Sequence, residues 1–141
     1  MTNWVLVSSA DNFETSRARG FDIAGMKSRH RKKAEKVQPG DKVFFYATVV
    51  KCIAGMAEVT GEYYEDHTKI WESNRPGEVY PFRFPIKIIK ARSKDNYLEL
   101  EPIFRTLEYP KRWPEKNWTL AFQGNVHIFS DEDAKILEDA L

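Results

Sequence analysis

Short apolar runs separated by turn signals dominate the chain and predict a protein built mainly from strands. Runs of this kind lie at residues 4–8, 43–50, 52–61, 79–89, 97–100 and 119–129. Within 79–89, Phe82, Phe84 and Ile86 recur at every second position, which predicts a strand with one buried face. Pro81 and Pro85 in the same run favour a sheet edge or a bulge.

Three segments carry helical signals instead. The residues Ser9 to Asn12 offer N-cap side chains and predict a short helix through Arg19, which Gly20 ends. A basic stretch at 28–36 predicts a second helix. At the end of the chain, Ser130 followed by Asp133 resembles a capping box, and the apolar spacing after it predicts a helix docked on the sheet.

Turn chemistry sets the boundaries between these elements. Pro39, Gly40 and Asp41 form a turn signal directly before the aromatic strand at 43–50. Gly55 interrupts the next strand and indicates a bulge or a close backbone approach. The polar stretches 21–25 and 66–77 are predicted loops.

These elements predict an α+β fold around one strongly curved sheet or open barrel, flanked by short helices. The chain has 141 residues, which is a single-domain length, so we expect one domain over 1–141. Hydrophobic residues (42%) and charged residues (30%) are ordinary for a globular protein, but the aromatic share of 13% is high. The extra rings could build a core or line a site.

Charge and targeting signals narrow the setting. The net charge is +1, but basic residues gather at 17–36 and acidic residues gather after Ser130. Cys52 has no partner for a disulfide, and we expect it to be a buried thiol. The N-terminus shows neither a signal peptide nor a membrane span, which predicts a cytoplasmic protein without a membrane partner. Oligomeric state stays open.

No motif indicates catalysis. His30, His67 and His127 share no metal-ligand spacing with one another or with Cys52, so we predict no metal site and no cofactor. Phosphate-binding glycine loops and nucleophile elbows are also absent. The run 65–67 (Glu-Asp-His) could hold an acid/base pair, although adjacent loop charges are usually only solvated.

Binding by aromatic rings and positive charge has better support. Of the four tryptophans, Trp4 and Trp118 lie in apolar runs and are expected in the core, whereas Trp71 and Trp113 lie among polar residues and could equally line a site. A ring beside positive charge suits an unpaired base. The basic stretch would place several cations on one helix side, either as a solvated face or as a phosphate-binding surface. The candidate phosphate-binding residues are Arg29, Arg31, Lys32, Lys33 and Lys36.

The order of these motifs resembles the EVE domain, a relative of the PUA and YTH folds. The resemblance covers nearly the whole chain. It is carried by Trp4-Val5-Leu6-Val7 with Ser8-Ser9 and Asn12-Phe13, the basic helix leading to Pro39-Gly40-Asp41-Lys42, Phe45-Tyr46, Ile53-Ala54-Gly55, Tyr64-Glu65-Asp66, Ile70-Trp71, Tyr80-Pro81-Phe82-Arg83 and Arg112-Trp113.

The resemblance implies a PUA-like open β-barrel with a pocket related to the aromatic cage of YTH domains. By position, the expected base pocket consists of Ser8, Ser9, Asn12, Ala24, Gly25, Lys27, Tyr46, Trp71, Arg83 and Trp113. Many EVE-like sequences have a tryptophan at the position of Ala24. One cage wall is therefore expected to be missing or to come from Phe21 or another ring.

Our hypothesis from the sequence is a non-catalytic module that binds a modified nucleobase in RNA or DNA. The base would stack on Trp71, with Ser8 or Asn12 hydrogen-bonding its edge. Two alternatives stay open: a pocket for a small molecule or free nucleotide, and a hydrolase of modified nucleotides with Asp66 as the acid/base.

Overall fold

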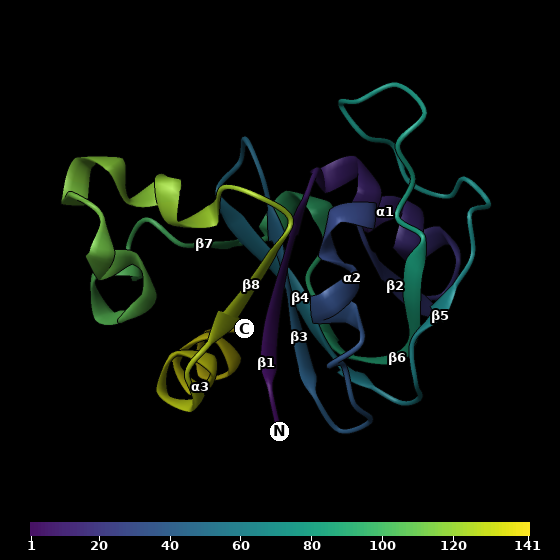
Figure 1. Cartoon of the computed structure of the whole chain (residues 1–141). Helices are drawn as coiled ribbons and strands as arrows, with labels where there is room; N and C mark the ends of the chain where they lie inside the picture. Colours follow the sequence, from purple (N-terminus) through teal and green to yellow (C-terminus); the bar gives the residue numbers. More distant parts are fainter.

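The protein, described by a computed structural model over residues 1–141, is built on a mixed sheet that curls into a half-barrel (Figure 1). The strands are β1 (Asn3–Ser8), β2 (Ile23–Met26), β3 (Lys42–Ala47), β4 (Cys52–Val59), β5 (Tyr64–Glu65), β6 (Phe82–Ala91), β7 (Leu98–Glu99) and β8 (Val126–Phe129). Their order is β2-β6-β4-β3-β1-β8, with β5 paired to β6 and β7 to β4. The predicted α+β, PUA-like open barrel is confirmed.

The curl comes from β6. Its first half pairs with β2 and its second half pairs with β4, so the strand bends from one part of the sheet to the other. β1 and β3 run parallel, and the other pairs are antiparallel. Since β2 pairs only with β6, and β8 only with β1, the barrel remains open between its two end strands.

Helices cover both sides of this sheet. They are α1 (Ala10–Ala18), α2 (Arg31–Ala34) and α3 (Asp131–Ala140), with 3₁₀ turns η1 (Ser28–His30), η2 (Lys94–Asn96), η3 (Phe104–Thr106), η4 (Tyr109–Arg112) and η5 (Glu115–Phe122). α1 and α2 lie on the side enclosed by the curl, whereas α3 and η3–η5 lie on the other side (Figure 1). None of the helices has the length and apolar character that a membrane crossing requires.

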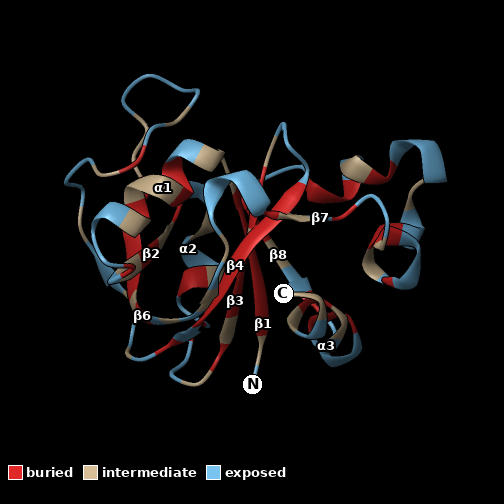
Figure 2. Cartoon of the chain, turned by 180° about the vertical axis from the view of Figure 1, so that it is seen from behind, coloured by how far each residue is buried: buried red, intermediate tan, exposed pale blue.

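Side-chain alternation along β1 and β3 divides the core in two. Trp4, Leu6 and Val43 point into the enclosed side, whereas Val5 and Phe44 point to the side covered by α3 and η5. Figure 2 shows these central strands as the most buried part of the molecule. Neighbouring residues on a strand therefore belong to different cores. Only every second side chain can reach a site on one given face of the sheet.

The turn and cap predictions are confirmed. Asp41 is buried and its carboxylate accepts hydrogen bonds from Trp4 Nε1 (2.9 Å) and Gln38 N (3.0 Å). A Cβ on Gly55 would lie 2.5 Å from the Lys90 carbonyl oxygen, and the pairing opposite Gly55 is irregular, so both expected features occur there. The Oγ atoms of Ser9 and Ser130 cap α1 and α3.

Three boundaries were predicted wrongly. Part of the expected loop 21–25 forms β2, which is too short to show a period. The expected strand 119–129 is split between η5 and β8, because short apolar runs do not distinguish helix from strand. The basic stretch 28–36 forms η1 and a single turn, α2, rather than one helix.

Candidate functional site

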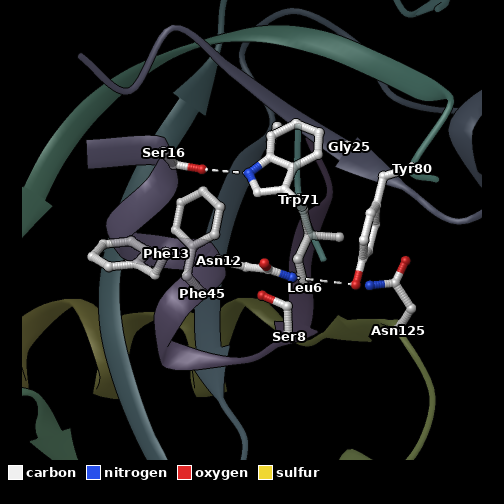
Figure 3. Close-up of a pocket in the computed structure, with 11 residues that line it drawn as sticks. Leu6, Ser8, Asn12, Phe13, Ser16, Gly25, Phe45, Trp71, Tyr80 and Asn125 are labelled. Carbon is white, nitrogen blue, oxygen red and sulfur yellow. Dashed lines mark hydrogen bonds between the residues drawn. The ribbon is translucent and has the colours of Figure 1, made fainter. Parts of the chain in front are cut away.

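A pocket opens on the enclosed side of the sheet, between β1, α1, β2 and the loop that follows β5 (Figure 3). Its cavity holds only about 30 Å³, roughly the space of one water molecule and well below the range of small-ligand sites. We call it the inner pocket. It is lined by Leu6, Ser8, Asn12, Phe13, Ser16, Ala24, Gly25, Phe45, Trp71, Tyr80 and Asn125.

Trp71 forms one wall of the inner pocket and is held there by a hydrogen bond and by close packing. Its indole is only 6% exposed, and Nε1 donates to Ser16 Oγ at 2.9 Å. Tyr80 meets the indole edge-on, with ring centroids 5.7 Å apart. A Cβ on Gly25 would lie 2.8 Å from Trp71 Cζ3, so the residue at 25 must be glycine for the indole to lie where it does.

Arg83 supports this wall from behind. Its guanidinium lies 5.5 Å from the Trp71 ring, and its side chain is 1% exposed. Nε donates to the Tyr80 carbonyl at 3.0 Å, a second nitrogen donates to the Thr68 carbonyl, and a third lies 3.4 Å from the Asp66 carboxylate. Arg83 therefore holds the Trp71 loop and does not line the pocket.

Asn12 holds the same loop from α1. Its Nδ2 donates to the Glu72 carbonyl (2.8 Å) and its Oδ1 accepts from the Glu72 backbone N–H (3.0 Å). Both ends of the amide are thus engaged next to Trp71. The result is an indole fixed by polar contacts on the loop, which leaves the space in front of it unfilled.

Asn125 closes the barrel seam beside the pocket. Its Nδ2 donates to the Val7 carbonyl (2.9 Å), and its Oδ1 accepts from the Lys27 backbone N–H (3.0 Å), so it links β1 to the end of β2. The Ser8 hydroxyl makes no hydrogen bond within the protein and faces the pocket (Figure 3). Ser8 is therefore the polar group at the pocket that is available to a ligand.

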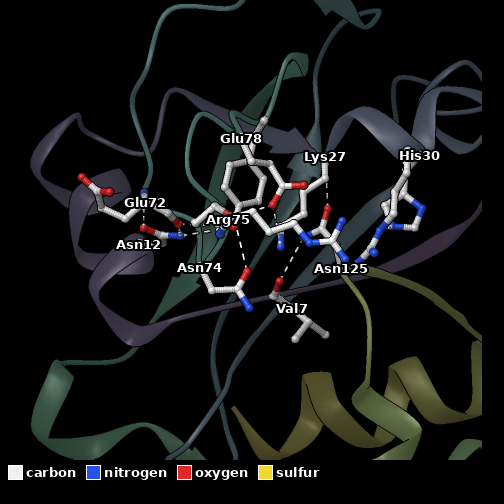
Figure 4. Close-up of polar contacts among 12 residues, drawn as sticks. Val7, Asn12, Lys27, His30, Glu72, Asn74, Arg75, Glu78 and Asn125 are labelled. Carbon is white, nitrogen blue, oxygen red and sulfur yellow. Dashed lines mark hydrogen bonds and ion pairs between the residues drawn. The ribbon is translucent and has the colours of Figure 1, made fainter.

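The inner pocket adjoins a wider cleft of about 540 Å³, which we call the outer cleft and which shares Ser8, Asn12, Tyr80 and Asn125 with it. Lys27 and Glu78 form an ion pair in its wall at 3.3 Å (Figure 4). The Ser73 hydroxyl donates to the Glu78 carboxylate, and this bond, with the charge of Lys27, lowers the pKa of Glu78. This part of the wall is electrically balanced.

Two other cations in the outer cleft have no carboxylate partner. Arg29 and Arg75 both line it and neither has a carboxylate within 4.0 Å, although the charge of Arg75 also helps to lower the pKa of Glu78. Arg29 Nε lies 3.4 Å from His30 Nε2. Burial and the charges of Lys33 and Arg29 lower the pKa of His30 to about 4. The imidazole is neutral at neutral pH, so the outer cleft has a net positive rim at its two arginines.

Comparison with known proteins identifies the family. The sequence matches the family model for the EVE domain over residues 2–125. The chain belongs to the EVE domain family. A UPF0310 protein of Pyrococcus abyssi is 30% identical over the whole length of both chains, and one of Pyrococcus horikoshii is 30% identical over 100% of this chain and 99% of that protein.

Solved structures confirm the PUA-like, YTH-like fold of this EVE domain. A complex of the YTH domain-containing protein Mmi1 with RNA superimposes with a TM-score of 0.66 at 14% identity, covering 99% of this chain and 80% of that one. The protein PSPTO5229 of Pseudomonas syringae superimposes with a TM-score of 0.63 at 19% identity and 99% coverage of both chains. At such identities the likeness concerns the fold alone.

The structure brings together part of the predicted base pocket of this EVE domain. Ser8, Asn12, Ala24, Gly25 and Trp71 line the inner pocket. The outer cleft contains Ser9 and Lys27.

Tyr46 and Trp113 lie elsewhere, which corrects their predicted places. The Tyr46 ring points to the opposite face of β3 and stacks on Phe122 at 4.2 Å. Trp113 is half-buried beside Tyr109, in the segment η4–η5. The sequence analysis placed Tyr46 at the pocket, whereas the side chain that faces the pocket from β3 is that of its neighbour Phe45.

Ala24 leaves one expected wall without a tryptophan, and Phe21 does not replace it. Phe21 packs on Phe13 with ring centroids 5.2 Å apart and does not line the pocket. The rings that do line it besides Trp71 are Phe13, Phe45 and Tyr80. Ala24 itself is buried and packs in the core on the enclosed side of the sheet.

Of the predicted phosphate-binding residues, only Arg29 lines the outer cleft. Arg31 pairs with Glu65 at 3.2 Å, and Lys33 Nζ lies 3.4 Å from the Val126 carbonyl. Lys32 and Lys36 are exposed outside the cleft. The cations are dispersed because the stretch is a 3₁₀ turn followed by one α-helical turn. Sequence analysis missed Arg75 and Asn125, since no local pattern separates them from ordinary loop residues.

No three or more His, Cys, Asp or Glu side chains are grouped so that they could hold a metal ion. Cys52 is buried, and burial raises the pKa of its thiol.

Proposed function

We propose that this EVE domain is a non-catalytic module that binds a modified nucleobase of RNA or DNA. The base enters the inner pocket and lies against Trp71, and the adjoining phosphates lie in the outer cleft. One observation carries the proposal: a fixed tryptophan wall in a small pocket that opens directly into a cleft with two unpaired arginines.

The inner pocket is lined by aromatic rings, which suit a flat ligand, and its cavity of about 30 Å³ widens when a base enters. Stacking of a base on an aromatic side chain contributes about 1–3 kcal/mol. The Ser8 hydroxyl can donate to or accept from the edge of the base, because no protein group engages it.

The outer cleft suits a phosphate backbone. Arg29 and Arg75 are free of carboxylate partners, and guanidinium groups bind phosphates through paired N–H donors. Each neutralised phosphate releases counterions, so affinity should fall with salt. The fold of Mmi1, solved in a complex with RNA, supports the same class of ligand.

The hydrolase alternative has less support. Asp66 does not line the inner pocket, and a hydrogen bond from the Thr68 backbone, with the charge of Arg83, lowers its pKa. A carboxylate held in its ionised form is a poor proton donor near neutral pH. The small-molecule alternative makes a different prediction, because a free nucleobase would not depend on Arg29 and Arg75.

The experiment is titration of short RNA and DNA strands with one methylated base or none, at several salt concentrations. The test variant is Ser8→Leu, which fills the mouth of the inner pocket from a half-exposed position. Thr60→Leu is the matched control, because Thr60 is exposed and distant from both cavities. Thermal unfolding of both variants verifies that they are folded.

We expect the unchanged protein to prefer at least one methylated strand, and Ser8→Leu to lose that preference while Thr60→Leu keeps it. Replacing Arg29 and Arg75 by alanine should weaken binding to all strands alike and flatten the salt dependence. Binding of free methylated nucleobases as tight as that of strands, with no salt dependence, would favour the small-molecule alternative. If Ser8→Leu binds each strand with the same affinity as the unchanged protein does, the proposal is contradicted.

A further inference from the structure

The hairpin between β3 and β4 ends in an apolar tip beside the outer cleft. Val49 is 91% exposed and Val50 is 50% exposed, and Figure 2 shows this tip as exposed. Thr48, the first residue of the tip, lines the outer cleft, and its backbone N–H donates to the Ser8 carbonyl at 2.9 Å. The tip is therefore fastened to the strand end that carries Ser8.

The backbone at the tip is strained. Val49 has a φ of 68°, and the Val50 N–H donates to the Thr48 carbonyl at 2.7 Å. A three-residue turn closed in this way around a positive φ is the rare and strained form of the γ-turn. Positive φ in a β-branched residue is an outlier, since Cβ crowds the backbone.

Lys51 in the same tip also has a positive φ, of 58°, and its backbone N–H donates to the Ala47 carbonyl at 3.1 Å, which closes the hairpin. At four other positive-φ positions, such as Gly20 and Gly124, the chain has glycine. Phe21 also has a positive φ, but its ring is buried against Phe13. Val49 has a positive φ and almost no packing, so its side chain does not stabilise the folded protein. Strain of this kind at an exposed site is a reason to look for a functional role.

We propose that Val49 packs against the nucleobase next to the one held in the inner pocket. The inference rests on the proposed function, because the neighbouring base is present only when a strand follows the outer cleft. Two features favour a base over a protein partner: the tip adjoins the cleft through Thr48, and the cations nearest the cleft suit phosphates. In other complexes apolar side chains insert between neighbouring bases and partly unstack them.

The test uses Val49→Asn and Val49→Gly, since both residues tolerate a positive φ. Each should raise the melting temperature by a few degrees and weaken strand binding about five- to tenfold, the low end for contact with one base. Val49→Leu keeps an apolar tip and should keep the affinity without raising the melting temperature. Ile89→Ser removes exposed apolar surface from β6, away from the cleft, and should leave affinity unchanged.

The strands are the methylated and unmethylated RNA and DNA of the Ser8→Leu experiment, each as a single strand and as a duplex. Unchanged affinity in Val49→Asn, with the loss in Ser8→Leu intact, would overturn this inference and leave the proposed function standing. Unchanged affinity in both variants would overturn the proposed function as well. A larger loss for duplexes than for single strands would support the inference, as a space-filling contact predicts.

Discussion

The two faces of β3 use aromatic residues in opposite ways. On one face, Tyr46 stacks on Phe122 almost in parallel, at an interplanar angle of 2°, and Phe104 stacks on Trp118 at 10°. On the other face, Phe45 borders the inner pocket with Trp71 across from it. The first face is a closed core, and the second contains a cavity.

The difference lies in what holds each ring. In the closed core, rings fill one another's contact surface, so no flat space remains. At the pocket, Trp71 is held by Ser16, and its loop is held by Asn12 and Arg83. At its edge the Trp71 ring is fixed by a polar contact, and Arg83 lies over one of its faces. The wall is therefore rigid beside a cavity of about 30 Å³, so a bound base has to widen the pocket.

The largest expected effect follows from replacing one tryptophan on each side of the sheet by alanine. Trp71→Ala and Trp118→Ala should each cost about 3–5 kcal/mol of unfolding free energy, because both rings are buried. Under conditions where both variants are folded, only Trp71→Ala should lose affinity for the preferred strand. Urea denaturation and strand titration provide the two measurements. If Trp118→Ala weakens binding as much as Trp71→Ala, the two faces do not differ in function.

Loosening the polar contacts should have an intermediate effect. Asn12→Leu removes both hydrogen bonds to the Glu72 backbone and should cost about 1–3 kcal/mol of stability. Amide hydrogen exchange at Glu72 should accelerate in this variant. The affinity of the inner pocket for the preferred strand should fall in parallel. Asn117→Leu, at an exposed position in η5, is the control and should change neither quantity. Unchanged exchange at Glu72 would show that other contacts, such as those of Arg83, are sufficient.

The extent to which the sequence predicts this molecule follows from the same contrast. The curved sheet depends on strand periodicity, so Phe82, Phe84 and Ile86, which are buried on the enclosed side, could be recognised from their spacing. The pocket depends on contacts between distant segments, such as Asn12 with Glu72. Such pairs leave no periodic trace, and the family resemblance gave positions rather than side-chain directions.

The case of Tyr46 shows the limit most clearly. A shift of one position along a strand moves a side chain to the other face. Motif matching locates Phe45-Tyr46 but does not tell which of the two rings faces the pocket. Asn125, which follows Gly124 in a run that looked like one strand, was missed because its role depends on the opening between β2 and β8.

A smaller effect concerns His30, on the pocket side. Its pKa in the folded protein is about 4, against an ordinary value of 6.5, because of burial and the charges of Lys33, Arg29, His127 and Lys27. Between these pH values the unfolded chain binds a proton that the folded one does not, so stability falls as pH falls from 6.5 to 4.

His30→Gln should remove that part of the pH dependence, about 1 kcal/mol, since solvent screens a half-buried ring. The measurement is the free energy of unfolding by urea at intervals across this range. A profile in the variant as steep as that of the unchanged protein would assign the pH dependence to other groups, with His127 the next to test, because its pKa is also lowered by burial.

The smallest expected effects come from removing one hydroxyl group on one face of β3 or adding one on the other. The Tyr46 hydroxyl makes no hydrogen bond within the protein, and burial raises its pKa to about 12, so it is neutral and unused. Tyr46→Phe should therefore change stability by less than about 0.5 kcal/mol and leave strand affinity unchanged. Phe45→Tyr is the reciprocal change at the neighbouring position, and it places a hydroxyl at the inner pocket. It should reduce affinity severalfold, because a bound base would cover a polar group that has no partner there. Reduced affinity in Tyr46→Phe, with none in Phe45→Tyr, would mean that the ligand binds on the face we describe as closed core.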